Sequence, residues 1–337
     1  MFKYAIIILI LFLAGGIYVY AYDVYVPVNK NGSDRVFSVS KGEGVKEISR
    51  DLQNAGLIRS SFFFETYVWL TKSQSKFVAG DFTLSSKLNT AEIVKVFVSG
   101  ETLSKERTIK IVEGWNAKEI ASYLENNDVV SASDFLNAVD SKNADLYKKD
   151  YDFLSDKPKD ASLEGYLFPD TYRIYKDASV NDVIKKMLDN FDRKLTPEMR
   201  ADIAKRGRTI YEEVTMASLI EKEVKTESDM KIVSGIFWKR IKNGQPLELD
   251  STLTYALGDS KTSHSIEETR INSPYNTYKY KGLPPGPIAN PSLNAIDAAI
   301  YPEETDYNYF LTDASGRTIF SKTYAEHLQN KAKYLGN

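Results

Sequence analysis

The chain of 337 residues contains no cysteine and only two histidines, His264 and His327. The absence of cysteine excludes disulfides, thiol nucleophiles, thiolate zinc sites and iron–sulfur clusters. A Ser-His-Asp triad or a multi-histidine metal site would need one of these two histidines, which lie far apart in sequence. Chemistry must rely on carboxylates, hydroxyls, lysines or a carboxylate-bound metal. Since no spacing demands such a metal, we expect neither metal nor cofactor.

The chain also lacks an excess of one charge, with 44 Lys+Arg against 46 Asp+Glu and a formal net charge of −2. Proteins that bind nucleic acid normally carry a basic surface that displaces counterions from phosphate. We therefore expect no nucleic-acid partner. The composition is otherwise that of a globular protein, and the length fits two or three domains.

One long apolar run stands near the N-terminus. Residues 4–21 carry no charge, with Lys3 before them and Asp23 after them. Eighteen residues in a helix extend about 27 Å, close to the hydrocarbon thickness of a bilayer. We expect residues 1–24 to form a retained single transmembrane helix rather than a buried core helix or a cleaved signal peptide. The N-terminus is then cytoplasmic and the rest of the chain extracytoplasmic.

A segment of the first half repeats after 72 residues without a gap. Residues 39–63 align with residues 111–135, and Gly42 meets Gly114. Each copy predicts a strand, a glycine turn and a helix. After a linker over 25–35, the first copy and its continuation, residues 36–101, resemble a lysin-motif (LysM-like) module, which either binds glycan or serves as a spacer. The second copy and a charged, solvated connector fill 102–160.

Helix-capping patterns are frequent beyond residue 160. They predict helices that start near residues 180, 197, 210 and 324, and an apolar stripe predicts another over 229–242. Short apolar stretches at 309–311 and 318–320 flank DASG, which is typical of a hairpin. The predicted fold class is α+β, with residues 161–337 as one mixed α+β domain.

The helix that starts at residue 210 sets one carboxylate on its apolar face. Ile210, Val214 and Ala217 follow helical spacing, and Glu221 comes four residues later. A carboxyl held against apolar side chains favours its protonated form, which a general acid needs. Glu223 is rotated by about 200° and points to the other side. The alternative is that Glu221 is a surface glutamate, paired with a basic side chain or exposed to solvent.

Three segments combine aromatic rings with short polar side chains. They read EGYLFPDTY (164–172), LDSTLTY (249–255) and SPYNTYKYKGLPPGPIANP (273–291). Such mixtures suit stacking on sugar rings and hydrogen bonding to their hydroxyls. They are also typical of loops that pack against a core, so both interpretations stay open.

Taken in order, the apolar run, the LysM-like module and these motifs resemble the bacterial endolytic murein transglycosylases (MltG/YceG-like), membrane-anchored enzymes that cut peptidoglycan glycan strands. The resemblance implies that Glu221, the first glutamate of IEKE, is the catalytic acid/base. One departure is Glu248 in LELD, where the family has glutamine. The matching substrate-binding residues are Glu164, Tyr166, Asp170, Asp250, Thr252, Tyr275, Asn276, Thr277, Pro285 and Asn290.

The resemblance also implies a nonhydrolytic lyase reaction in the catalytic domain over 161–337. Glu221 protonates the oxygen between N-acetylmuramic acid and N-acetylglucosamine, and then takes the proton of the muramyl 6-hydroxyl as that oxygen attacks C1. A 1,6-anhydromuramyl end results. The expected partners are nascent peptidoglycan strands, whose length the cuts set, peptidoglycan synthases and the membrane. The expected location is the bacterial plasma (inner) membrane, single-pass, with a periplasmic catalytic domain.

Two other functions remain open from the residues alone. One is a peptidoglycan-binding or scaffolding protein without catalysis. The other is a hydrolytic muramidase, which generally needs a second carboxylate such as Glu164 or Asp250. A peptidase fits least, because the chain offers no thiol, triad or metal cluster.

Overall fold

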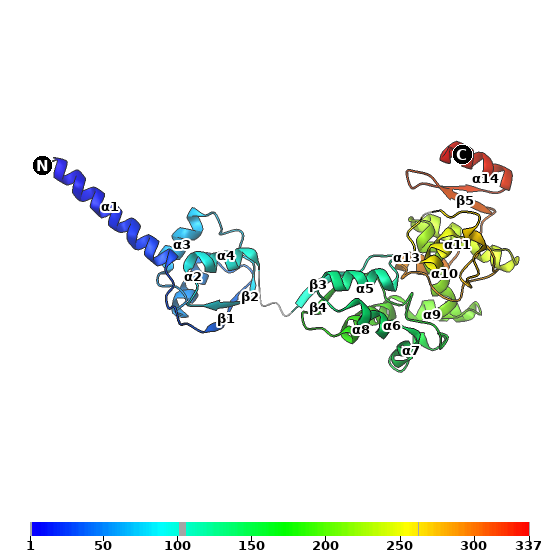
Figure 1. Ribbon diagram of the computed structural model, residues 1–337, viewed down its shortest axis with the longest axis horizontal. Helices are drawn as coiled ribbons and strands as arrows, with labels where there is room; N and C mark the ends of the chain where they lie inside the picture. Colours follow the sequence, from blue (N-terminus) through cyan, green and yellow to red (C-terminus); the bar gives the residue numbers. More distant parts are fainter. Residues whose placement is uncertain (1, 101–105, 262, 337) are drawn as a thin grey trace. The chain divides into compact units, whose positions relative to one another are not determined.

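The computed structural model describes residues 2–100, 106–261 and 263–336 (Figure 1). The chain divides into two compact units, Met1–Lys105 and Glu106–Asn337. The predicted boundary between residues 101 and 102 falls on residues 101–105, outside the described residues, as does the first residue of the predicted 1–24 segment.

The first unit packs helices around one antiparallel strand pair. Strand β1 (Asp34–Val39) pairs with β2 (Gly80–Ser85), with Phe37 opposite Phe82. Its helices are α1 (Phe2–Tyr25), α2 (Val45–Asn54), α3 (Ser61–Leu70) and α4 (Thr90–Ser99). Alternate strand residues and one stripe of each of α2, α3 and α4 form its core, which includes Phe37, Ile48, Leu52, Phe64, Phe82 and Phe97.

Helix α1 corrects the predicted membrane segment. Among the described residues, no helix is long and apolar enough to cross a membrane. The predicted transmembrane helix and the single-pass inner-membrane location are therefore wrong, whereas the membrane as a partner stays a prediction. The end of α1 packs on its own unit instead, since Val24 is fully buried and the ring of Tyr20 lies 5.8 Å from that of Phe63. The hydropathy of a run does not reveal such tertiary contacts.

The repeated segment folds into the same local structure twice. The predicted strand, turn and helix are confirmed in both copies, as β1 and α2 in the first and as β3 (Glu106–Lys110) and α5 (Ala117–Asn126) in the second. Gly42 and Gly114 both turn the chain with left-handed φ angles of 86° and 75°. The strand partners differ, because β3 pairs with β4 (Thr171–Tyr175) of the second unit. The LysM-like assignment stays a prediction.

The second unit is richer in helix than in strand, which agrees with the α+β part of the predicted fold class. In the described part of the chain, strands occur as three two-stranded antiparallel sheets, the third formed by β5 (Tyr309–Thr312) and β6 (Thr318–Ser321). Besides α5, the helices of this unit are α6 (Ala132–Val139), α7 (Ser141–Ala144), η1 (Asp145–Tyr147), η2 (Asp152–Leu154), α8 (Val180–Lys194), α9 (Pro197–Lys205), α10 (Ile210–Glu223), α11 (Glu227–Lys242), α12 (Asp250–Leu257), η3 (Glu268–Arg270), α13 (Leu293–Ile300) and α14 (Tyr324–Leu335).

The predicted helix starts of α8, α9, α10 and α14 are confirmed, because side-chain caps define them locally. At α10, for example, the Thr209 side chain accepts a hydrogen bond from the backbone N–H of Glu212, and the Glu212 carboxylate accepts one from the backbone N–H of Thr209. Helix α11 starts two residues earlier than predicted, since Thr226 is its N-cap. The predicted hairpin is confirmed as β5 and β6.

Helix α10 lies at the centre of the second core. Every residue from Glu213 to Ile220 is buried, and the helix packs against α11 and α13. The charged stretch 140–160, interpreted as a solvated connector, contributes Tyr147, Phe153 and Leu154 to this core. The C-terminal end of α10 therefore emerges from a rigid centre, which fixes the position of Glu221 and Glu223.

Candidate functional site

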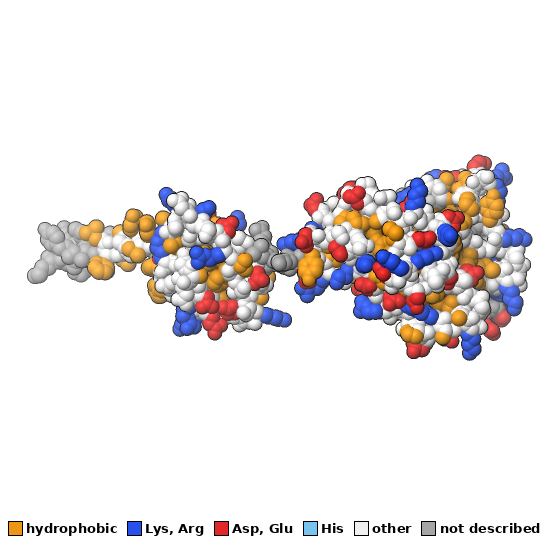
Figure 2. Space-filling model, turned by 90° about the horizontal axis from the view of Figure 1, so that it is seen from below, with side chains coloured by type: hydrophobic (Ala, Val, Ile, Leu, Met, Phe, Trp, Pro, Cys, Tyr) orange, Lys and Arg blue, Asp and Glu red, His pale blue; other side chains and the backbone are white. Residues whose placement is uncertain are grey.

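A groove of about 2070 Å³ crosses the second unit. Its walls come from α5, the end of α10, residues 247–251, α12 and the C-terminal hairpin with α14. Figure 2 shows one face of this unit, on which apolar side chains and charges of both signs are interspersed. The groove is lined by carboxylates, hydroxyls and aromatic rings, among them Glu164, Glu223, Asp250, Ser251, Tyr255, Tyr278 and Tyr309.

Glu221 lies in the last turn of α10 and is partly buried. Its Oε2 accepts hydrogen bonds from the backbone N–H of Ser292, at 2.9 Å, and from the Ser292 hydroxyl, at 2.5 Å. Burial raises the pKa of Glu221 above its ordinary value, although the bonds from Ser292 oppose the rise. The carboxyl thus combines an apolar setting, which favours the proton, with donors that stabilise the anion.

Gly114 lies beside this carboxyl, and its backbone angle rather than a lack of space favours glycine there. A Cβ at position 114 would lie 3.5 Å from Cγ and 3.9 Å from Oε1 of Glu221, and the left-handed φ of Gly114 disfavours any side chain. Lys222 donates to the Gly114 carbonyl at 3.3 Å. The turn that opens the second repeat therefore lies directly against the end of α10.

Glu223 lies in a different environment from Glu221, as the rotation of about 200° between the two residues along the helix predicts. Its Oε1 accepts a hydrogen bond from the Ser251 hydroxyl, at 2.7 Å, in the first turn of α12. Burial raises the pKa of Glu223, and the nearby Asp250 adds to the rise. Of the described residues, Lys222 and Glu223 line the groove, whereas Glu221 does not. The sequence alone does not identify Glu223 as a groove residue, although its helical offset from Glu221 shows that the two carboxyls face different sides of α10.

The side-chain amide of Asn290 connects several segments that lie next to the groove through hydrogen bonds. It is fully buried, and its Oδ1 accepts from the backbone N–H groups of Gly165, at 2.8 Å, and Leu167, at 2.9 Å. Its Nδ2 donates to the Trp115 carbonyl at 2.9 Å and to Glu164 Oε1 at 2.8 Å. All four hydrogen-bonding positions of the amide are occupied by protein, which favours a positioning role over direct contact with a ligand.

Glu164 joins Asn290 to α5. The Glu164 carboxylate accepts a hydrogen bond from the backbone N–H of Ala117, the first residue of α5, with both oxygens at 3.0 Å. Burial raises the pKa of Glu164 to about 7, while the bonds from Ala117 and Asn290 lower it. Glu164 also lines the groove, with a side chain that is almost inaccessible to water.

The pKa of Glu164 predicts a pH dependence of stability. Since its folded value of about 7 exceeds its ordinary value of 4.5, the folded state holds a proton that the unfolded state releases between these pH values. The free energy of unfolding should therefore fall as pH rises from about 4.5 to about 7. One pKa unit corresponds to about 1.4 kcal/mol, so the contribution of Glu164 is on the order of 3 kcal/mol.

Urea unfolding of the wild-type chain and of Glu164→Gln between pH 4.5 and 7.5 measures this contribution. We expect the wild-type unfolding free energy to decrease more steeply with pH than that of the variant, whatever the offset between them. Other buried carboxyls contribute equally to both proteins, so their contributions cancel in the difference between the two unfolding free energies. Parallel pH profiles would contradict the assignment.

Four other predicted residues lie around the start of α12. Asp250 lines the groove, and its Oδ1 accepts from the Tyr278 hydroxyl at 2.8 Å. Behind it, the hydroxyls of Thr252 and Thr277 lie 2.9 Å apart and are buried. The buried Asn276 donates to the carbonyls of residues 269 and 271 at 3.0 and 2.9 Å. Asp250 is thus open to a ligand, while the other three support the loops.

The remaining predicted residues lie apart from the groove. Tyr166 is fully buried in the core, with its ring 5.8 Å from that of Phe153. Asp170 is exposed and accepts from Asn190 at 2.9 Å. Tyr275 and Pro285 line a smaller cavity of about 170 Å³, which also reaches Glu164. The structure therefore brings together Glu164 and Asp250 on the groove, but not Tyr166 or Asp170.

The chain is similar to known proteins over almost its whole length. The YceG-like family model matches residues 37–333. The endolytic murein transglycosylase of Bacillus subtilis (strain 168) is 32% identical over 333 residues, which cover 96% of this chain and 92% of that protein. The protein of the same name from Streptococcus pneumoniae (strain D39) is 30% identical to this chain. The match covers 98% of this chain and 64% of that relative.

A solved structure agrees with these sequence matches. The crystal structure of a yceG-like protein from Listeria monocytogenes is 31% identical to the chain, with a TM-score of 0.61. The match covers 89% of this chain and 99% of that one. The chain belongs to the YceG-like family, which confirms the resemblance inferred from the ordered motifs.

Proposed function

We propose that this chain is an endolytic murein transglycosylase, a lyase that cuts peptidoglycan glycan strands between N-acetylmuramic acid and N-acetylglucosamine and leaves 1,6-anhydromuramyl ends. Membership of the YceG-like family and the names of relatives about 30% identical over nearly the full chain support the enzyme class. The observation that carries the proposal is the large groove of the second unit, with carboxylates and aromatic rings along its walls.

Glu221 serves as the single acid and base of the reaction. Protonated, it donates its proton to the glycosidic oxygen as the bond to C1 breaks. As a carboxylate, it then removes the proton of the muramyl 6-hydroxyl while that oxygen forms the new bond to C1. The substrate supplies the nucleophile and no water is consumed, so the paired carboxylates of ordinary glycosidases are not required. The raised pKa of Glu221 supports the first step, and the donors at Ser292 support the second.

Groove side chains hold the sugar rings in this proposal. Asp250 and Tyr278 present a carboxylate and a phenol to sugar hydroxyls, and Tyr255 offers an aromatic face. Glu223 provides a second carboxyl group on the groove wall, which can form a hydrogen bond to a sugar hydroxyl. This role needs no proton transfer, which separates it from that of Glu221.

Cuts inside nascent strands would set strand length. The word endolytic in the names of the relatives supports cleavage within a strand. An enzyme that limits strand length acts on the product of a polymerase, and peptidoglycan synthases are the partners that this proposal requires.

Mass spectrometry of the products tests the proposal. Purified peptidoglycan is incubated with the full chain, and the soluble fragments are analysed before and after borohydride reduction. We expect anhydromuramyl ends, which are lighter than reducing ends by one water molecule and resist reduction, on fragments several disaccharides long at early times.

Other products would identify the alternative functions. Reducible, hydrated ends would show a muramidase. Retention of the chain on peptidoglycan without soluble products would show a binding protein. Disaccharide units released from the start would contradict endolytic action while keeping the transglycosylase chemistry.

A further inference from the structure

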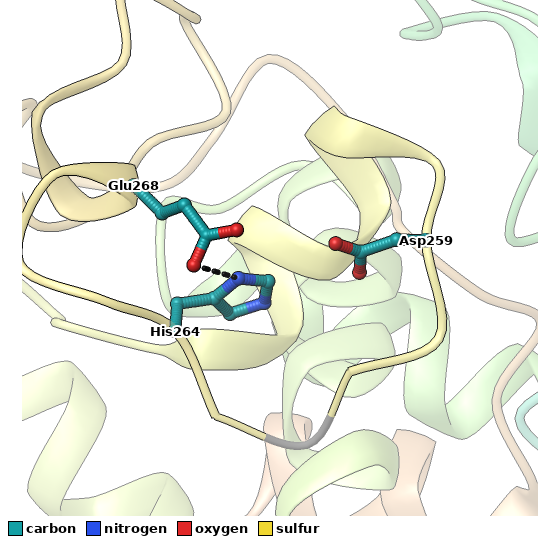
Figure 3. A group of neighbouring side chains, drawn as sticks. All are labelled: Asp259, His264 and Glu268. Atoms are coloured by element: carbon teal, nitrogen blue, oxygen red, sulfur yellow. Dashed lines mark ion pairs between the residues drawn. The ribbon is translucent and has the colours of Figure 1, made fainter.

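A histidine and two carboxylates form a compact cluster after α12. Asp259, His264 and Glu268 each offer one ligand atom, and these three atoms lie within 4.8 Å of one another. Figure 3 shows the three side chains pointing toward a common centre, with the imidazole facing the Glu268 carboxylate. Asp259 belongs to the groove lining, so the cluster lies at the edge of the groove.

The hydrogen bonds around His264 define which ring nitrogen carries the proton. The Thr254 hydroxyl donates to the carbonyl of Lys261 at 2.8 Å, because a carbonyl oxygen can only accept. Thr254 Oγ1 lies 2.9 Å from His264 Nε2 and must accept there, so Nε2 carries the proton. In the neutral ring, Nδ1 then holds a lone pair.

This lone pair is buried and faces a negative charge. The His264 side chain is 0% exposed, and Nδ1 has no hydrogen-bond partner among the described residues. Its neighbour is Glu268 Oε2, at 3.6 Å. Two electron pairs that face each other at this distance repel, and a buried acceptor without a partner costs free energy. A cation between the two atoms removes both penalties.

The spacing of His264 Nδ1 and Glu268 Oε2 fits a transition-metal ion, and Asp259 offers a third ligand atom within 4.8 Å of both. Zinc binds histidine nitrogen and carboxylate oxygen at about 2.0–2.2 Å, which places two tetrahedral ligand atoms about 3.4 Å apart. The observed 3.6 Å is close to this separation. Ca²⁺ and Mg²⁺ prefer oxygen ligands, and imidazole favours the zinc class. We propose that Asp259, His264 and Glu268 bind one divalent ion of the zinc class at the groove edge, with water in the fourth position.

Lys261 is the internal competitor of this ion. Its ammonium group forms an ion pair with Glu268 and lies 3.9 Å from Asp259 Oδ2, while 54% of its side chain is exposed. The lysine can therefore move into solvent when a divalent ion replaces its charge. The ion would therefore link the three side chains of Asp259, His264 and Glu268 at the edge of the groove. Metal binding itself is independent of the proposed enzyme activity.

Zinc titration calorimetry of the full chain tests the site, with Zn²⁺ alone as the probe at pH 7.5. The chain offers a matched control, because it contains no cysteine and one other histidine. His327 also has a buried Nδ1 without a partner, but among the described residues it belongs to no group of metal-binding side chains. We expect one tightly bound Zn²⁺ per chain in the wild type and in His327→Gln.

The ligand variants should bind zinc much more weakly. We expect His264→Gln and Asp259→Asn to lose at least about 100-fold in affinity, since loss of an outer-shell partner alone costs about 10–100-fold. Asp259 is partly exposed, so its variant keeps the test valid if His264→Gln does not fold. Lys261→Gln should bind about threefold more tightly, because the exposed ion pair it removes is weak.

Two results would overturn the proposal. Equal zinc affinity of His264→Gln and the wild type would place the ion elsewhere. Absence of zinc binding, together with ¹⁵N NMR signals of His264 that show both ring nitrogens protonated, would establish an imidazolium–carboxylate ion pair in place of a metal site.

Discussion

Replacing Glu221 by glutamine should reduce the release of anhydromuramyl products by at least about 100-fold, since general acid–base catalysis contributes about 10²–10⁴-fold. The amide oxygen of glutamine can still accept both hydrogen bonds from Ser292, which keeps the fold. The amide group cannot donate an acidic proton to the glycosidic oxygen. Initial rates of product release, with circular dichroism to confirm folding, measure the effect.

Glu223→Gln is the matched variant, two residues away on the same helix. Its amide oxygen can accept the hydrogen bond from Ser251, and the change removes a carboxyl group from the groove without removing the proposed acid. We expect a loss of about tenfold, equivalent to about 1.4 kcal/mol on the barrier. The reverse order, with the larger loss in Glu223→Gln, would identify the groove-facing carboxyl as the acid and reject Glu221.

Asn290→Ala should cause the largest loss of stability. The substitution removes four hydrogen bonds and leaves the backbone N–H groups of Gly165 and Leu167 buried without their acceptor, whereas the Trp115 carbonyl keeps the backbone N–H of residue 290. Each unsatisfied buried group costs about 1–3 kcal/mol, so the free energy of unfolding should fall by about 4 kcal/mol or more. This is a large part of the 5–15 kcal/mol that stabilises a typical domain.

Urea unfolding measures this loss, and Asn294→Ala provides the control. Asn294 is exposed in the first turn of α13, and its replacement should change stability by no more than about 0.5 kcal/mol. Asn290→Asp is the second variant, which keeps the acceptor oxygen but places a carboxylate against Glu164. It should lose stability increasingly as pH rises. An Asn290→Ala variant as stable as the wild type would show that water replaces the amide.

The sequence predicted what short-range chemistry decides. The starts of α8 and α10 depend on a serine or threonine and an acid three residues later, which can be read directly. The divergence of Glu221 and Glu223 follows from helical geometry alone. The direction in which each then points in the folded unit depends on α12 and α13, which pack from elsewhere in the chain.

Predictions about the aromatic segments were less reliable because composition does not distinguish a groove from a core. Tyr166 and Tyr255 both come from aromatic, polar segments, yet the first is fully buried among other rings and the second lines the groove. The prediction of a transmembrane helix from the apolar run near the N-terminus was wrong for a related reason. In the folded unit, Tyr20 within the run and Tyr25 just after it contact Phe63 and Tyr67 of α3, and hydropathy alone does not reveal such contacts.

The hydrogen bonds of Asn290 limit how early the groove can form while the chain is being synthesised. The first unit contains its strand pair and core before residue 106 is made, so it can fold early. The pairing of β3 with β4 requires the chain up to Tyr175. The side-chain amide of Asn290, which bonds to Trp115 and Gly165, is synthesised 175 residues after Trp115. The groove is therefore one of the last features to form, because a ribosome-bound chain that stops before residue 290 has the pairs β1–β2 and β3–β4 but lacks Asn290 and the hairpin and α14 that line the groove.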